Sequence, residues 1–202
     1  MTAKPRFLNV GGGSKAVWLP DYLKGFEHCL LDIDPRGAPD ILCDARELLT
    51  QKPDQFDAIY CSHNLEHYYA QDVPRVLKGF LHVLKPGGFA EIRVPDIGAL
   101  FAEVIARGLD IDDEIYTSGR GPILVRDMLY GFGPEIEASG QDFYAHKTGF
   151  TRKSLSRALQ SAGFGIRIAR NGRGRELLIY GFTPAPTKTQ VKLLGLKLPE
   201  KP

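Results

Sequence analysis

The chain has 202 residues, which suits one domain with a single hydrophobic core. Hydrophobic residues make up 43% of it and charged residues 25%, a balance that argues against a disordered chain. The formal net charge of +2 gives no concentrated basic character, so nucleic acid is not an expected partner. No apolar run reaches the about 18 residues of a membrane span, and the N-terminus has no signal-peptide pattern. Cys29, Cys43 and Cys61 show no paired spacing, which favours reduced thiols and a cytoplasmic location.

The first predicted strand, residues 6–10, ends in Gly11, Gly12 and Gly13. Glycine has no Cβ, so the backbone can turn sharply here and present N–H groups to a ligand at close range. A second apolar run, residues 28–33, carries carboxylates at its end. Asp32 could accept hydrogen bonds from both hydroxyls of a ribose. The pair of features is typical of a nucleotide site, although a simple glycine turn would show the same residues.

Strands and helices then alternate along the chain. We expect strands at 40–43, 56–61 and 89–96, and helices at about 65–84 and at 100–107. Connections of this length favour parallel strands, which require a crossover. Ligands bind beyond the carboxyl ends of such strands. The site should therefore gather the strand-end residues Gly11, Gly13, Asp32, Asp44, Ser62, His63 and Asp96.

Residues 108–148 show no periodicity and are rich in glycine, aspartate and aromatic residues, which predicts a substrate lid or insertion. Thr151 is a candidate cap for a helix that ends at Gly163. Asn171-Gly172 lies between two strand-like runs, 164–169 and 176–182, and favours a hairpin with an antiparallel last strand. We expect one domain over residues 1–183, and a tail over 184–202.

In this order, the motifs resemble those of the Rossmann-like (class I) S-adenosylmethionine-dependent methyltransferases, in particular the small-molecule, type 11-like subgroup. The likeness rests on the glycine motif at 8–13, the acidic strand end at 31–34, the segment 56–67, Lys85-Pro86-Gly87-Gly88 and residues 155–164. The resemblance implies an α/β fold: a seven-stranded, mostly parallel sheet with an antiparallel last strand and helices on both faces. The chain departs from the family pattern at Asn9, a position where the family often has an acidic residue.

The resemblance also implies S-adenosylmethionine as cofactor and methyl transfer by in-line displacement. The acceptor stays unidentified, with a small molecule or a glycan expected. Asn9, Gly11 and Gly13 would surround the methionyl part of the cofactor, and Asp32 would hold the ribose. Asp44 and Ala45 would border the adenine, and Ser62 and His63 would lie near the sulfonium. The full predicted cofactor set is Asn9, Gly11, Gly12, Gly13, Asp32, Ile33, Asp44, Ala45, Ser62 and His63. An acceptor that needs a base could use His63, His67 or His146.

Two alternative functions remain open, and a third pattern is set aside. Gly11-x-Gly13-x-x-Ala16 with Asp32 also fits a dinucleotide fingerprint, as in an NAD-dependent oxidoreductase. A non-catalytic nucleotide-binding subunit would show the same glycines. His63-Asn64-Leu65-Glu66-His67 has the H-x-x-E-H spacing of some zinc proteases, but no third ligand can be identified from the sequence, so no metal is predicted. The sequence does not indicate the oligomeric state.

Overall fold

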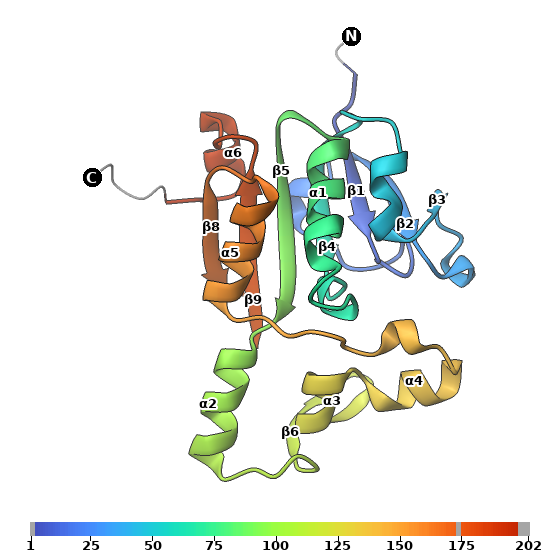
Figure 1. The fold of residues 1–202 in the computed structure, drawn as a ribbon, viewed down its shortest axis with the longest axis vertical. Coiled ribbons are helices and arrows are strands. Elements are labelled where there is room, and N and C mark those ends of the chain that lie inside the picture. Colours follow the sequence, from blue (N-terminus) through green and yellow to red (C-terminus); the bar gives the residue numbers. More distant parts are fainter. Residues whose placement is uncertain (1–2, 173–174, 198–202) are drawn as a thin grey trace.

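A computed structural model describes residues 3–172 and 175–197 of the chain. Its centre is a seven-stranded sheet in the order β3-β2-β1-β4-β5-β9-β8 (Figure 1). The strands are β1 (Arg6–Val10), β2 (Glu27–Asp32), β3 (Ile41–Leu42), β4 (Phe56–Ser62), β5 (Leu84–Pro95), β8 (Arg167–Asn171) and β9 (Glu176–Phe182). The strands from β1 to β5 pair in parallel, and β9 is antiparallel to both β5 and β8. The predicted fold class is confirmed.

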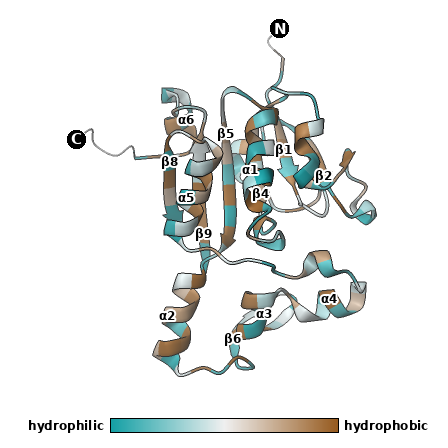
Figure 2. Ribbon diagram, in the orientation of Figure 1, coloured by the Kyte–Doolittle hydropathy of each residue, from teal (hydrophilic) through white to brown (hydrophobic). Residues whose placement is uncertain are grey.

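Both faces of the sheet are covered, which is why its central strands are nearly continuous apolar runs. Leu8 and Val10 of β1 point to one face and belong to the buried cluster that also contains residues of α1 (Val73–Val83) and α5 (Arg152–Ala162). Phe7 points to the other face, towards η1 (Asp21–Leu23) and α6 (Lys188–Leu193). Figure 2 shows apolar residues interspersed with polar ones along α1 and α5, as expected for helices with one buried side.

The helix expected over residues 65–84 is shorter than predicted. The chain forms a 3₁₀ turn, η4 (Leu65–His67), and α1 begins only at Val73, with Asp72 at its N-cap. Proline has no N–H and clashes with the preceding turn, so Pro74 is tolerated only in the first turn of the helix. The prediction was wrong because it carried the apolar periodicity through this proline.

The segment 108–148, called the lid segment below, contains more regular structure than expected. It follows α2 (Ile97–Arg107) and forms β6 (Glu114–Ser118), β7 (Gly121–Leu124), α3 (Val125–Tyr130), α4 (Gly133–Ser139) and η5 (Asp142–Tyr144). These elements have three to seven residues each, too few to show a period in the sequence. Ile115, Ile123 and Met128 form a separate small core with Leu100 of α2. Figure 1 shows the lid segment beyond the carboxyl ends of the parallel strands.

The C-terminal part of the chain lies partly on the sheet. Within the predicted tail, 184–202, α6 is followed by Leu194 and Leu196, which are buried in the same cluster as Phe7 and Phe182. Residues 198–202 lie outside the described residues, as do positions 173–174 of the predicted hairpin turn. Thr151 caps α5 as predicted, by accepting a hydrogen bond from the Ser154 N–H. Within the described ranges, no helix combines the length and the apolar character needed to cross a membrane.

Candidate functional site

The glycine corner at the end of β1 is shaped by the absence of side chains. Gly11 and Gly13 have φ angles of +68° and +66°, in the left-handed region that favours glycine. A Cβ added to Gly11 would lie 2.0 Å from Nδ2 of Asn64, so only glycine allows this close approach. Asn9 is 1% exposed and its amide lies against Gly12. Asn9 therefore supports the corner from within the fold.

Asp32 lies at the end of β2, beside the glycine corner. Its Oδ2 accepts a hydrogen bond from the Gly13 N–H at 2.8 Å, and its Oδ1 accepts one from the Asp34 N–H at 2.9 Å. Each carboxylate oxygen can accept a further hydrogen bond, so Asp32 retains the capacity to bind two hydroxyls. It lines a cavity of about 120 Å³ together with Gly11, Gly13 and Asn64.

Asn64 was not predicted as a site residue. It follows β4 and lines the same cavity as Asp32. Its Oδ1 is buried and accepts no hydrogen bond from the part of the chain that the structure describes. A buried oxygen of this kind is ordinarily paired. A nucleoside cofactor with polar groups at both ends would fit this arrangement of the glycine corner, the Asp32 carboxylate and the Asn64 oxygen.

A second cavity, of about 230 Å³, continues from the first and shares Ile33, Asn64, His67 and Phe143 with it. Asp44 lines it. Although burial opposes ionisation, hydrogen bonds from Arg46 hold the pKa of Asp44 below its ordinary value. The neighbouring Ala45 is 1% exposed, so only its backbone could border a ligand.

A larger cavity of about 500 Å³ lies between the lid segment and the strand ends. Its walls include the apolar and aromatic residues Pro95, Tyr116, Ile123, Met128 and Phe132. The three histidines predicted as candidate bases, His63, His67 and His146, also line it. The fold thus brings His146 beside residues from which it is distant in the sequence. His63, His67 and Tyr144 line this cavity and the one at the glycine corner.

His63 directly follows Ser62, the last residue of β4, and has a φ of +51°. A left-handed conformation is uncommon for a residue with a side chain, and such residues often occur at functional sites. Its Nε2 is 2.8 Å from Oε1 of Glu176, and its Nδ1 is 3.4 Å from Oε1 of Glu66. Burial opposes the charged form, but the hydrogen bond to Glu176 and the negative charge of Glu66 raise the pKa of His63 to about 10.

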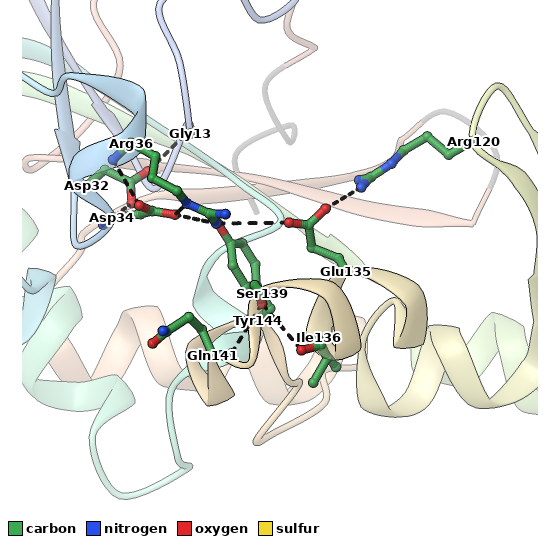
Figure 3. Close-up of polar contacts among 10 residues, drawn as sticks. All are labelled: Gly13, Asp32, Asp34, Arg36, Arg120, Glu135, Ile136, Ser139, Gln141 and Tyr144. Atoms are coloured by element: carbon green, nitrogen blue, oxygen red, sulfur yellow. Dashed lines mark hydrogen bonds and ion pairs between the residues drawn. The ribbon is translucent and has the colours of Figure 1, made fainter.

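A cluster formed by Asp34, Arg36 and Tyr144 connects the end of β2 to the lid segment (Figure 3). The Tyr144 hydroxyl donates to Oδ2 of Asp34 at 2.7 Å and accepts from Nη2 of Arg36 at 2.6 Å. Hydrogen bonds from Arg36 and Tyr144 hold the pKa of Asp34 far below its ordinary range. The sequence showed only an aromatic-rich loop and a second aspartate, so it gave no reason to pair them.

The fold and the glycine corner define a nucleotide-binding α/β domain. The chain belongs to the methyltransferase domain family, whose sequence model matches residues 2–167. No curated protein matches the chain. The predicted class, an S-adenosylmethionine-dependent methyltransferase with S-adenosylmethionine as cofactor, is confirmed. The oxidoreductase alternative finds no support.

Solved structures with low sequence identity share the fold. An S-adenosylmethionine-dependent methyltransferase from Archaeoglobus fulgidus is 14% identical, with a TM-score of 0.56 over 89% of this chain and 86% of that one. A possible histamine N-methyltransferase from Thermotoga maritima is 16% identical, with a TM-score of 0.52 over 91% and 84% of the two chains. The 1,6-didemethyltoxoflavin-N1-methyltransferase of Burkholderia thailandensis, solved with 1,6-didemethyltoxoflavin and S-adenosylhomocysteine, is 16% identical, with a TM-score of 0.50 over 89% and 71%.

Proposed function

We propose that the protein methylates a small organic molecule held between the lid segment and the strand ends. One observation carries this proposal: His63, His67 and Tyr144 line both the cavity at the glycine corner and the larger cavity. In-line displacement requires donor and acceptor to meet at one place in a fixed orientation. A wall shared by two cavities provides such a meeting point. When bound, S-adenosylmethionine supplies the activated methyl group.

The cofactor side is formed by the residues at the ends of β1, β2 and β4. We propose that Asp32 accepts hydrogen bonds from the ribose hydroxyls, and that Ile33 and Asp44 border the adenine. The Gly11 and Gly13 N–H groups are already bonded to the Leu31 carbonyl and to Asp32, so the side-chain-free backbone of the glycine corner would border the polar methionyl end, and the Oδ1 of Asn64 would accept a hydrogen bond from it. Ser62 and His63 would then lie nearest the reacting methyl group, at the entrance to the larger cavity.

A small molecule fits the acceptor side better than a glycan chain. The cavity of about 500 Å³ lies within the range of small-molecule sites, about 300–1,000 Å³, and most of its lining is apolar or aromatic. Two fold neighbours are named for small acceptors: one for 1,6-didemethyltoxoflavin, and one as a possible methyltransferase of histamine. His63, His67 and His146 stay candidates for the group that takes a proton from the acceptor. A cytoplasmic location stays a prediction from the three free cysteines.

Asp32→Ala tests the cofactor side. Loss of two charge-assisted hydrogen bonds should weaken S-adenosylmethionine binding at least about tenfold, equivalent to about 1.4 kcal/mol or more, in isothermal titration calorimetry. Because Asp32 also supports Gly13, circular dichroism must show that the variant is folded.

Asp57→Asn is the control for this experiment. Asp57 also lies near a strand end of the sheet, but at the start of β4, where it accepts hydrogen bonds from the Arg6 N–H and from Lys85. Asparagine keeps an acceptor there, so affinity should equal that of the unchanged protein. An Asp32→Ala variant that is folded and binds S-adenosylmethionine normally would rule out the proposed cofactor site.

A further inference from the structure

Three side chains with metal-ligand chemistry meet at the wall of the acceptor cavity. Glu66 and His67 belong to η4, and His146 lies where the lid segment returns to the sheet. One potential ligand atom of each lies within 4.8 Å of the others. The return of the chain is fixed by the N–H groups of Lys147 and Thr148, which both donate to the Glu66 carbonyl, at 2.8 and 3.1 Å.

The Glu66 carboxylate is buried without a hydrogen-bond donor. Its side chain is 1% exposed, and neither Oε1 nor Oε2 has a hydrogen-bond partner among residues 3–172 and 175–197. The ring nitrogens nearest to it are His63 Nδ1, at 3.4 Å from Oε1, and His146 Nε2, at 3.9 Å. His63 is already bonded through Nε2 to Glu176. The nearby cation, the His63 imidazolium, is thus shared between two carboxylates, and neither Glu66 oxygen receives a hydrogen bond from the described residues. Buried charges in proteins are ordinarily paired or coordinate a metal, so the Glu66 carboxylate retains capacity for a metal cation.

The two histidines are oriented as metal ligands usually are. Nδ1 of His67 lies 3.1 Å from the Ala145 carbonyl oxygen, and Nδ1 of His146 lies 3.2 Å from that of Met128. A carbonyl oxygen only accepts, so both Nδ1 atoms carry the proton in these contacts, and in the neutral rings both Nε2 atoms have a free lone pair. Metal-binding histidines typically donate their other N–H to a carbonyl or carboxylate in this way.

We infer that Glu66, His67 and His146 bind a divalent transition-metal cation such as Zn²⁺. Two imidazole nitrogens and one carboxylate suit such a cation better than Mg²⁺ or Ca²⁺, which prefer oxygen ligands. Bonds of about 2.0–2.2 Å place ligand atoms about 3.3 Å apart, so the cluster must contract by on the order of 1 Å.

The cation would retain an open coordination position on the acceptor side. Three protein ligands leave a fourth position free in a tetrahedral site. Because His67 and His146 line the acceptor cavity, that position faces the bound acceptor. This step rests on the proposed function. It narrows the acceptor to molecules that offer the cation a ligand atom, such as a hydroxyl or carboxylate oxygen or an unprotonated nitrogen.

Zinc titration of the chelator-stripped protein tests the metal site. We expect one equivalent of Zn²⁺ to bind per chain with a Kd below about 10 µM in isothermal titration calorimetry, and Mg²⁺ to bind far more weakly. Glu66→Gln, which keeps the shape of the side chain, and His146→Ala should each weaken Zn²⁺ binding at least about 100-fold. His82→Ala is the control, because His82 lies on α1 and contacts the Gln51 carbonyl oxygen instead. It should bind Zn²⁺ as the unchanged protein does.

Titration of the same metal-free proteins with S-adenosylmethionine separates this inference from the proposed function. His146 lines neither the glycine-corner cavity nor the cavity beside it that Asp44 lines, so His146→Ala should still bind the cofactor. Glu66→Gln is not used for this comparison, because Glu66 contacts His63. No Zn²⁺ binding at about 100 µM, or equal binding by Glu66→Gln or His146→Ala, would overturn the metal site. Failure of the unchanged protein to bind S-adenosylmethionine would instead overturn the proposed function.

Discussion

At the scale of single residues, Gly11 is the position where backbone conformation and packing both exclude a side chain. Gly11→Ala places a Cβ at a φ of +68° and 2.0 Å from Asn64 Nδ2. We expect a loss of about 1–2 kcal/mol in the free energy of unfolding, measured by urea denaturation. Because Asn64 must move away from the cofactor cavity, S-adenosylmethionine affinity should fall at least about tenfold.

Gly25→Ala is the matched control. Gly25 precedes β2, and a Cβ there would meet no atom within 4 Å. Its substitution should leave both stability and affinity within about 1 kcal/mol of the original values. Normal cofactor affinity in Gly11→Ala would show that the contact between the corner and Asn64 is not needed for binding.

The sequence predicted the site residues that local chemistry marks, and missed those that only the tertiary structure brings together. Gly11, Gly13 and Asp32 stand at strand ends in a recognisable order, and the structure places them around one cavity. Asn64 carries no such mark. His146 was predicted as a candidate base, but nothing in the sequence placed it beside Glu66 and His67. His67 and Ala145, which are in contact, are separated by 78 positions, and their contact depends on how the lid segment returns. No local pattern encodes that path.

At the scale of elements, strand β5 contains a buried charged residue, Glu91, within the sheet. Glu91 is 0% exposed, and its carboxylate accepts hydrogen bonds from the Tyr22 hydroxyl and from Nε of Arg93, both at 2.7 Å. Glu91→Ala would leave Arg93, 8% exposed, without its nearest carboxylate. We expect the free energy of unfolding to fall by about 3 kcal/mol, measured by urea denaturation.

Glu27→Ala provides the comparison. Glu27 forms an exposed ion pair with Arg6 at 3.2 Å, and its loss should cost less than about 1 kcal/mol. Equal effects of the two substitutions would contradict a structural role for the buried Glu91 pair.

Elements were predictable where periodicity or capping residues were strong. The strands ending at Val10 and Asp32 and the capped helix α5 follow directly from apolar runs and from Thr151. The start of α1 was misplaced because the apolar spacing begins at Leu65 and Tyr68, ahead of Pro74, whereas Pro74 fixes the first turn of the helix. The lid elements escaped prediction because each is too short for its own period to appear.

At the scale of the whole molecule, an ion-pair cluster joins α2, which leads into the lid segment, to the sheet. Glu103 accepts two hydrogen bonds from Arg175, at 2.6 and 2.7 Å, and one from Arg107 at 2.7 Å. Arg175 first, and then Arg107, lower the pKa of Glu103 to about 2. The folded state therefore favours the ionised form. Its contribution to stability is fully present above the ordinary pKa of about 4.5 and is lost as the pH falls through about 2.

Glu103→Gln should accordingly be less stable than the unchanged protein at pH 6, with a difference that shrinks as the pH falls from about 4.5 to about 2. Urea denaturation at a series of pH values measures this difference. A difference that does not depend on pH in that window would show that the glutamate contributes by shape or neutral hydrogen bonding rather than by charge.

Tyr144 and His67 belong to the walls of both cavities, so the affinities for the two bound molecules are thermodynamically linked. If cofactor binding fixes these side chains and so changes the affinity for the acceptor by some factor, acceptor binding must change the affinity for the cofactor by the same factor. A search for the acceptor is therefore best conducted with S-adenosylhomocysteine present at saturation, because only then are both sides of the shared wall in the arrangement that the acceptor meets during turnover.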